Sequence, residues 1–276
     1  MTNTGSFTAT GGLRLYTRAW MPSNTPAAHV ILIHGYGDHC GRYERFAHAL
    51  NDASLAVHSY DQRGFGLSQG KRAYVGCFDD LLADLDRFLQ VVEPDIHGKP
   101  VFMLGQSFGG LITVRYAETR QPGFSGLVLC SPFLGISETI PKPLLQLGKY
   151  IAKVAPWMPV SKVEAKGLSR RPEVVAAADQ DPLGYHGTVR ARTGAEMQKA
   201  VEDAFNDISR LSLPLYIVHG DADSIVPLSG SQRLYAQCAS TDKTLRVFPG
   251  GYHELWQDLD EETMVTGVRE WLRQRL

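Results

Sequence analysis

A serine stands between two glycines in the pentapeptide GQSFG at residues 105–109. The apolar run before it is typical of a strand, and the apolar residues that follow at helical spacing are typical of a helix. A strand that turns sharply into a helix leaves no room for side chains two residues before and after the serine, which explains Gly105 and Gly109. Such a turn would present the Ser107 hydroxyl as a nucleophile. The alternative is a plain helix cap, because serine is also a favoured N-cap residue.

A serine hydroxyl is a weak nucleophile at neutral pH, so this chemistry needs a base and a carboxylate that orients the base. In this strand-to-helix motif the partners follow the serine in the order Asp, then His. The segments HGDADSIV at 219–226 and PGGYHEL at 249–255 each come directly after an apolar run. We therefore predict His253 as the general base and Asp223 as its partner. Asp221 competes with Asp223, but it directly follows the strand and could instead cap the turn.

Acyl transfer also needs hydrogen-bond donors for the negative charge that develops on the carbonyl oxygen. The segment IHGYG at 33–37 follows the first long apolar run, and its glycines allow a backbone N–H to point at that oxygen. We expect the backbone N–H groups of Tyr36 and Phe108 to form this oxyanion hole. His34 in the same turn is interpreted as a structural residue that braces the turn, rather than as a second catalytic histidine.

The elements that would position these residues alternate between apolar strands and amphipathic helices. Apolar strands separated by helices are typical of a parallel sheet that is covered on both faces. We therefore predict an α/β fold with a mostly parallel central sheet flanked by helices, preceded by a hairpin over 7–20 that turns at Gly11-Gly12. The predicted strands are 29–35, 55–61, 100–105, 126–132, 213–220 and 244–250, and the predicted helices are 42–52, 78–92, 108–120, 227–238 and 264–276.

The alternation stops between residues 133 and 206. This span has three prolines within 141–156 and no clear strand. We expect a helical insertion here, directly after the strand at 126–132. The core domain would then consist of residues 1–132 and 207–276.

The composition of the chain excludes several classes of function. Its 276 residues carry 28 basic and 29 acidic side chains, and the net charge of −1 provides no basic field for nucleic acid. The chain start has no basic and apolar leader, and no run reaches the ~18 apolar residues of a spanning helix, so we expect a cytoplasmic protein.

The four cysteines are far apart and are interpreted as reduced thiols. No HExxH, clustered Cys/His ligands or GxGxxG with its acidic partner occurs, so neither a metal nor an organic cofactor is expected.

Together these motifs resemble the α/β-hydrolase superfamily, and within it the monoacylglycerol lipase and lysophospholipase branch of serine aminopeptidase S33-like hydrolases. The resemblance covers nearly the whole chain. It rests on HGYGDHCGRY at 34–43, DQRGFGLSQGKR at 61–72, the elbow at 105–110, LSRRPEVVAAADQDPLGYHG at 168–187, HGDADSIVP at 219–227 and YHE at 252–254. Two departures leave the preferred chain length of the substrate open. Gln106 and Phe108 flank the serine where histidine and methionine are usual, and Phe65 stands where histidine is usual.

The resemblance implies a serine hydrolase that cleaves carboxylic esters with one acyl chain and a small polar alcohol, above all monoacylglycerols, without a cofactor. A lysophospholipase or a broad carboxylesterase is the alternative within the enzyme class. A catalytically silent small-molecule receptor of the same fold is the alternative outside it. Asp38 and Arg42 match positions near the polar end of the pocket, where they could bind the hydroxyl groups of glycerol. The same two residues could instead form an ion pair that braces the loop.

The resemblance also makes residues 133–206 a cap over the active site. Within it, 141–159 has the pattern of a basic amphipathic helix. Its apolar stripe includes Leu144, Leu147 and Ile151 and ends at Trp157, and its flank carries Lys142, Lys149 and Lys153. A helix of this kind can lie on an anionic lipid surface, so we expect reversible contact with a membrane or micelle. The alternative is an ordinary cap helix whose apolar face packs on the core.

Overall fold

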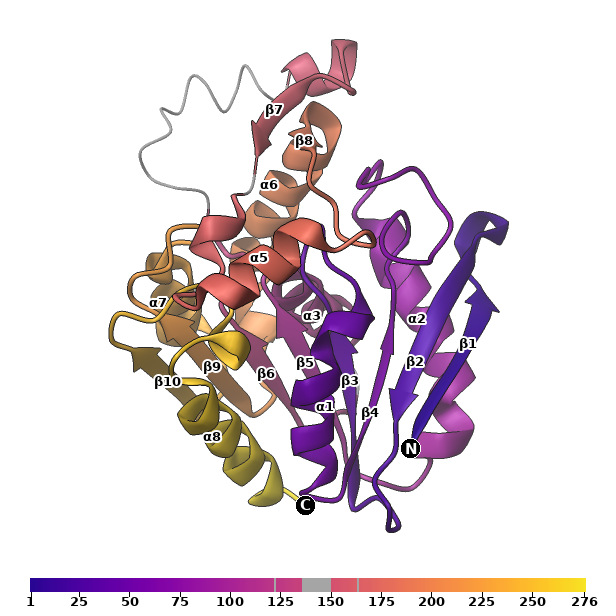
Figure 1. Cartoon of the computed structure of the whole chain (residues 1–276), viewed down its shortest axis with the longest axis vertical. Helices are drawn as coiled ribbons and strands as arrows, with labels where there is room; N and C mark the ends of the chain where they lie inside the picture. The colour runs from indigo at the N-terminus through magenta and orange to yellow at the C-terminus, as the bar shows by residue number, and fades with distance from the viewer. Residues whose placement is uncertain (122, 136–149, 163) are drawn as a thin grey trace.

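The computed structural model describes residues 1–121, 123–135, 150–162 and 164–276. In this part of the chain, eight strands form one sheet in the order β1-β2-β4-β3-β5-β6-β9-β10 (Figure 1). β1 pairs with β2 and β2 with β4 in antiparallel fashion, and all the other pairings are parallel. The strands are β1 (Thr2–Thr8), β2 (Arg14–Trp20), β3 (Ala28–Ile33), β4 (Leu55–Tyr60), β5 (Val101–Gln106), β6 (Gly126–Cys130), β9 (Leu215–Gly220) and β10 (Lys243–Phe248). The predicted mostly parallel α/β sheet is confirmed.

Helices cover both faces of this sheet (Figure 1). One face carries α1 (Glu44–Asn51) and α8 (Glu261–Arg273), and the other carries α2 (Asp79–Ile96), α3 (Phe108–Arg120) and α7 (Leu228–Gln237). Successive side chains of a strand point to opposite faces, so Leu32 of β3 joins the core under α1 and α8, whereas Ile31 joins the core under α2 and α3. Burial on both faces explains why the strand segments are apolar throughout instead of alternating.

Short 3-10 helices join several of these elements. The hairpin between β1 and β2 turns through η1 (Thr10–Gly12), where Gly11 and Gly12 have φ angles of 74° and 76° that favour glycine. The others are η2 (Cys40–Tyr43), η3 (Ala165–Gly167), η4 (Ile208–Arg210) and η5 (Leu255–Gln257). Across the described ranges, none of the helices has the length and apolar character needed to cross a bilayer.

The described part of the chain between β6 and β9 lies over the carboxyl ends of the parallel strands (Figure 1). This part contains α5 (Pro172–Gln180), α6 (Ala191–Asn206) and a two-stranded antiparallel sheet of β7 (Pro159–Lys162) and β8 (Thr188–Arg190). The insertion, which was expected to be helical, therefore also contains a small sheet that the sequence does not indicate. β7 has 4 residues, all exposed, and β8 has 3 residues, so neither shows the apolar run or the alternation that reveals a strand in a sequence.

The basic amphipathic helix predicted at 141–159 lies partly outside the described residues, which begin again at 150. Leu144, Leu147 and the lysines at 142 and 149 belong to the part that is not described. Residues 150–154 are helical, and the chain then turns near Pro156 and enters β7 at Pro159. The predicted helix therefore extends too far at its carboxyl end, because proline lacks the N–H group that would continue a helix.

Candidate active site

Ser107 lies at the sharp turn between β5 and α3, with a φ of 51° and a ψ of −116°. A positive φ is rare for a residue with a Cβ, and such strain occurs at functional sites. A Cβ on Gly105 would collide with the backbone of Gly109, and one on Gly109 would collide with the carbonyl oxygen of Ile33. Although Ser107 is the N-cap residue of α3, its side chain makes no capping hydrogen bond. Helix capping therefore does not explain this serine.

His253 and Asp223 come from the loops that follow β10 and β9, and a hydrogen bond joins them. Nδ1 of His253 lies 2.7 Å from Oδ2 of Asp223, and because a carboxylate only accepts, the ring donates from Nδ1. This leaves Nε2 as the ring nitrogen that can take a proton. Asp221 has a different partner: its Oδ1 accepts the backbone N–H of Gly250 at 2.6 Å and so caps the loop that leads to His253.

Several N–H groups hold the buried Asp223 carboxylate in its charged form. Oδ1 accepts the backbone N–H groups of Ile225 and Val226 at 2.8 and 2.9 Å, and Oδ2 accepts from His253. Nε2 of His219 lies 3.3 Å from the same Oδ2. Burial acts to raise the pKa of this carboxyl, but the charge of His253 and the hydrogen bonds from His219, His253 and Val226 outweigh burial. The pKa of Asp223 therefore lies well below its ordinary value.

His253 is 4% exposed, and the pKa of its imidazole is raised above the ordinary value for histidine. Burial works against the charged ring. The negative charge of Asp223, the hydrogen bond to it, and the charges of Glu254 and Asp38 work in the opposite direction and together are larger. A raised pKa makes the ring a stronger base toward a serine hydroxyl.

The loop that carries His253 is bonded to both the core and the insertion. The side-chain Nε2 of Gln106 donates to the carbonyl oxygen of His253 at 3.2 Å. The backbone N–H groups of His253 and Glu254 donate to the carbonyl oxygens of Gly167 and Leu168, at 3.4 and 2.8 Å. Gln106, which departs from the pattern of the branch, therefore braces the histidine from the position directly before the serine.

Backbone donors from two elements come close to Ser107. A Cβ built on Gly35, directly before Tyr36, would lie 3.4 Å from the Ser107 Cβ, so this turn approaches the serine closely. Phe108 follows the serine and begins α3, whose N-terminus favours negative charge. Among the described residues, neither Tyr36 N–H nor Phe108 N–H has a hydrogen-bond acceptor. Free N–H groups in this position are the donors that an oxyanion requires.

His34 supports the turn at Gly35 and Tyr36 from inside the core. Its Nε2 accepts the backbone N–H of Gln62 at 2.9 Å, and its Nδ1 lies 2.8 Å from the carbonyl oxygen of Gly35. Burial lowers the pKa of this ring. Phe65, the second departure from the branch, packs edge-on against the rings of His34 and Tyr36. These contacts agree with the structural role expected of His34.

Asp38 and Arg42 both line the pocket, but their charged groups are already bonded to the protein. Arg42 forms a two-point ion pair with Glu254 at 2.9 and 2.7 Å, and its Nη1 lies 3.3 Å from Asp38. Asp38 also accepts the Tyr43 hydroxyl and the backbone N–H of His39, each at 2.8 Å. The loop-bracing ion pair is therefore present, and it includes Glu254 as a further partner.

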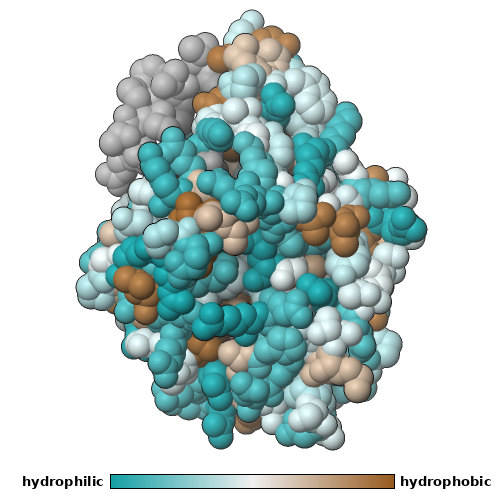
Figure 2. Space-filling model, in the orientation of Figure 1, coloured by the Kyte–Doolittle hydropathy of each residue, from teal (hydrophilic) through white to brown (hydrophobic). Residues whose placement is uncertain are grey.

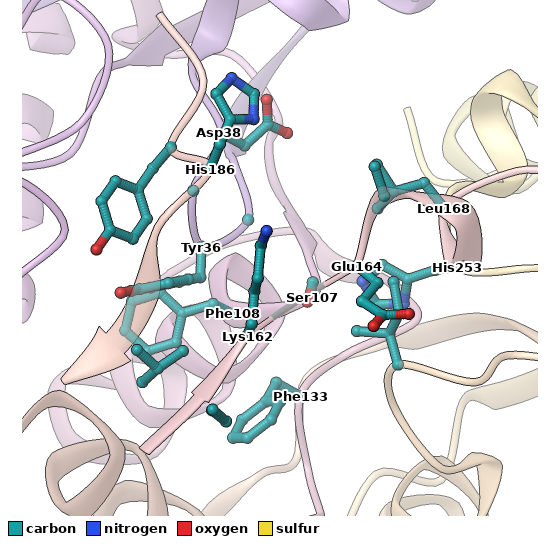
Figure 3. Close-up of a pocket in the computed structure, with 18 of the residues that line it drawn as sticks. Tyr36, Asp38, Ser107, Phe108, Phe133, Lys162, Glu164, Leu168, His186 and His253 are labelled. Atoms are coloured by element: carbon teal, nitrogen blue, oxygen red, sulfur yellow. The ribbon is translucent and has the colours of Figure 1, made fainter. Parts of the chain in front are cut away.

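These groups surround a cavity of about 1100 Å³ beneath the insertion. In the view of Figure 3, Ser107 lies on the cavity wall with Tyr36 and Phe108 to one side and His253 to the other. Apolar side chains from the core and the insertion form much of the remaining wall: Phe133, Ile151, Val160, Leu168, Val189, Met197 and Ile225. An apolar cavity with a few polar groups at the reacting end suits an ester with an acyl chain.

The family model described as serine aminopeptidase, S33, matches residues 24–260. The chain belongs to this family. It is 34% identical over 268 residues to a monoacylglycerol lipase of Mycolicibacterium smegmatis, with coverage of 97% of this chain and 95% of that protein. It is 33% identical over 268 residues to a monoglyceride lipase of Mus musculus, with coverage of 96% and 88%. The resemblance to this branch of the α/β-hydrolases is confirmed.

Solved structures lead to the same family. The crystal structure of the Paleococcus ferrophilus monoacylglycerol lipase has a TM-score of 0.85 at 32% identity, with coverage of 95% of this chain and 99% of that one. A soluble variant of the Saccharomyces cerevisiae monoglyceride lipase, in complex with a substrate analog, has a TM-score of 0.84 at 24% identity, with coverage of 99% and 94%. At 24% identity, the similarity to the Saccharomyces cerevisiae structure supports the fold alone. The chain is a serine hydrolase with the α/β-hydrolase fold.

Sequence reasoning missed two residues at this site, Glu254 and His219. Both stand in segments that the motifs did single out, one directly after His253 and the other four residues before Asp223. A carboxylate that is buried beside the histidine needs a cation nearby. Arg42 lies in the motif at 34–43, so the pairing of Glu254 with Arg42 could have been inferred. No local pattern indicates the contact of His219 with Asp223, because it depends on the path of the loop between them.

Proposed function

We propose that this serine hydrolase cleaves monoacylglycerols into glycerol and a free fatty acid. The chain is 32–34% identical, over nearly its whole length, to proteins named monoacylglycerol or monoglyceride lipases. The observation that carries the proposal is the 2.7 Å hydrogen bond between His253 and Asp223, at a pocket whose wall also includes Ser107. A strained serine, a base and a buried carboxylate are the parts that acyl transfer requires.

In the proposed reaction, Nε2 of His253 takes the proton of the Ser107 hydroxyl while Oγ attacks the ester carbonyl carbon. The oxyanion that forms accepts hydrogen bonds from the N–H groups of Tyr36 and Phe108. The imidazolium, stabilised by Asp223, then protonates the glycerol oxygen as the ester C–O bond breaks. A water molecule repeats the cycle on the acyl-serine, releases the fatty acid and restores the hydroxyl.

We propose that residues 133–206 form a cap over a core of residues 1–132 and 207–276, and that the acyl chain lies between the two. The cavity wall includes apolar side chains from both parts, among them Ile151 of the cap and Ile225 of the core. Burying a methylene group is worth about 0.8 kcal/mol, so the length of this wall sets the preferred acyl length.

We place the glycerol end of the substrate beside Asp38 and Arg42. Both line the pocket, and a guanidinium has more N–H groups than the contacts with Glu254 and Asp38 use. Because Glu254 already pairs with Arg42, this end suits neutral hydroxyl groups better than a phosphate. The pairing favours a monoacylglycerol over a lysophospholipid.

Hydrolysis of monoolein, lysophosphatidylcholine and p-nitrophenyl esters of graded length tests this proposal. We expect kcat/KM to be higher for monoolein than for lysophosphatidylcholine, and we expect no turnover by Ser107→Ala. Higher kcat/KM for lysophosphatidylcholine would make the protein a lysophospholipase. If a fluorophosphonate left Ser107 unmodified and no ester were cleaved, a receptor of the same fold would be the better account.

We also propose that the end of the cap makes reversible contact with a membrane or micelle. Figure 2 shows hydrophobic surface at this end, around β7. Large apolar side chains here are between 45% and 63% exposed: Tyr150, Val154, Trp157, Met158 and Val160. Lys153 and Lys162 are exposed in the same segment. Apolar side chains flanked by cations are suited to an anionic lipid surface.

Flotation with anionic liposomes at low salt tests this contact. We expect the protein to float with the vesicles, and we expect the double variant Val154→Ser, Lys153→Glu to float less. The exposed Lys99 lies at the other end of the molecule, before β5, so Lys99→Glu serves as the charge-matched control. If the protein stays unbound, or if the double variant floats as well as the control, the cap does not bind lipid through this surface.

A further inference from the structure

His219 is a second histidine at the triad carboxylate, and the proposed reaction does not use it. It lies near the end of β9, four residues before Asp223, and none of its side chain is exposed. It is not among the residues that line the cavity. The ring therefore faces neither solvent nor substrate, and whatever it does must act through its neighbours.

The contacts of this ring determine which nitrogen carries the proton. Nε2 faces two acceptors, the carbonyl oxygen of Val226 at 3.1 Å and Oδ2 of Asp223 at 3.3 Å, so Nε2 is the donor. Nδ1 lies 2.8 Å from the hydroxyl of Ser231 in α7 and accepts it. In this tautomer both nitrogens of His219 are bonded, and one N–H is directed to the region of the triad carboxylate.

Oδ2 of Asp223 thus lies between two imidazoles, with His253 at 2.7 Å and His219 at 3.3 Å. The backbone N–H groups of Ile225 and Val226 hold Oδ1 in place by hydrogen bonds. The carboxylate can still rotate about that oxygen, which would move Oδ2. The Nε2–H group of His219, which Oδ2 shares with the carbonyl oxygen of Val226, limits this motion. In a site closed to water, a carboxylate oxygen that loses a donor has no water molecule to replace it.

We propose that His219 is a positioning residue of the triad, which holds Oδ2 of Asp223 in line with Nδ1 of His253. The inference rests on the proposed function, since it assigns His219 a part in the same acyl transfer. His219 itself touches neither the substrate nor the reacting atoms. The competing explanation is that the ring only fills the core and ties β9 to α7 through Ser231.

Two polar variants separate these explanations. The side-chain nitrogen of glutamine can occupy the place of Nε2, whereas that of asparagine reaches only the place of Nδ1. His219→Gln therefore keeps a donor for Asp223, and His219→Asn removes that donor while it keeps a polar partner for Ser231. Both variants carry an amide in the same buried position, so a general effect on packing acts on both.

With p-nitrophenyl butyrate as substrate, we expect kcat of His219→Asn to fall roughly 10- to 100-fold with little change in KM, and kcat of His219→Gln to stay within about threefold. We also expect a change in the dependence of kcat/KM on pH. The acid limb of this profile, where kcat/KM falls as the pH drops, should lie at higher pH in His219→Asn than in the wild type. Asp223 with one donor fewer attracts the proton of His253 more strongly. Equal kcat and equal acid limbs in the two variants would overturn the proposal.

A second measurement does not depend on the substrate. The Nδ1 proton of His253 lies in a 2.7 Å hydrogen bond and should give a strongly deshielded proton NMR resonance. We expect this resonance to shift in His219→Asn and to keep its position in His219→Gln. An unchanged resonance in both variants overturns the positioning role. If the resonance shifts as expected but the wild type cleaves no ester, the positioning role stands and the proposed substrate is wrong.

Discussion

Glu254, directly after His253, forms a two-point ion pair with Arg42, with nitrogen–oxygen distances of 2.9 and 2.7 Å. Glu254 is 3% exposed, so its charge acts on its surroundings with little screening by water. This charge is one of the groups that raise the pKa of His253. The pair therefore links the loop after β3 to the strength of the proposed base.

Replacing Glu254 by Gln should move the acid limb of the kcat/KM profile to lower pH. His253 must be unprotonated to accept the serine proton, so activity is lost as the pH falls through its raised pKa. Removing a nearby negative charge lowers that pKa, and the ring stays unprotonated at lower pH. Rates with p-nitrophenyl butyrate across the acid range check this. Glu262→Gln on the exposed side of α8 is the charge-matched control. If the acid limb of Glu254→Gln lies at the same pH as that of the control, Glu254 does not raise the pKa of His253.

Replacing Asp223 by Asn should lower kcat about 10⁴-fold while the protein remains folded. The variant loses the charge that stabilises the His253 imidazolium, and its amide favours the wrong tautomer of the ring. Asp221→Asn should keep kcat near the wild-type value, because Asp221 bonds the backbone of Gly250. Steady-state kinetics and circular dichroism on both variants check this. The opposite ranking of the two variants would show that Asp221 is the functional acid.

Replacing the buried Asp258 by Asn should weaken both stability and turnover. Asp258 accepts the backbone N–H groups of Tyr252 and Arg170 and the Nε–H of Arg170, at 3.0, 2.8 and 2.9 Å, so it ties the loop of His253 to the insertion. An amide cannot accept from all of these donors, and we expect a loss of about 2 kcal/mol in the free energy of unfolding.

Urea unfolding and kcat measured together check the Asp258→Asn prediction. Asp260→Asn is the control, since Asp260 contacts the same Arg170 but is 38% exposed, and an exposed pair is worth less than about 1 kcal/mol. Equal losses in the two variants would mean that Asp258 has no special part in holding the histidine loop.

The free energy of unfolding should fall as the pH drops from about 6.5 toward 4. His29 of β3 and His58 of β4 are buried, with Nδ1 of the first 2.9 Å from Nε2 of the second. Burial lowers the pKa of both rings, and burial together with the charge of His29 lowers the pKa of His58 from 6.5 to about 4. The unfolded chain therefore binds protons in this range that the folded chain does not. For His58 alone the shift corresponds to roughly 3 kcal/mol.

Urea unfolding at pH 7 and at pH 4.5 checks this stability prediction. The variant His58→Gln removes the group with the larger shift, so its free energy of unfolding should depend less on pH over the same interval. If the wild type and the variant show the same dependence on pH, the histidine pair does not control acid stability.

The fold and the order of the site residues could be predicted because both leave local marks in the sequence. Strands such as β3 are apolar runs because they are buried on both faces, and the turn at Ser107 requires glycine at 105 and 109 for steric reasons. The preference for Asp223 over Asp221 came from the position of each in the loop. Each of these inferences uses residues within a few positions of one another.

What escaped prediction depends on contacts between distant segments. β7 and β8 have only 4 and 3 residues, and they pair across an interval in which the sequence has no strand signal. The bond between Arg42 and Glu254 joins residues 212 positions apart. The contact of His219 with Asp223 depends on how one loop folds back. Such partners become visible only when the chain path is known.

Mass spectrometry of the protein after reaction with a fluorophosphonate tests the central claim most directly. We expect one covalent adduct, on Ser107, which forms much more slowly in His253→Ala and does not form in Ser107→Ala. An adduct on another residue, or a His253→Ala variant that reacts at the wild-type rate, would contradict the claim that His253 activates this serine.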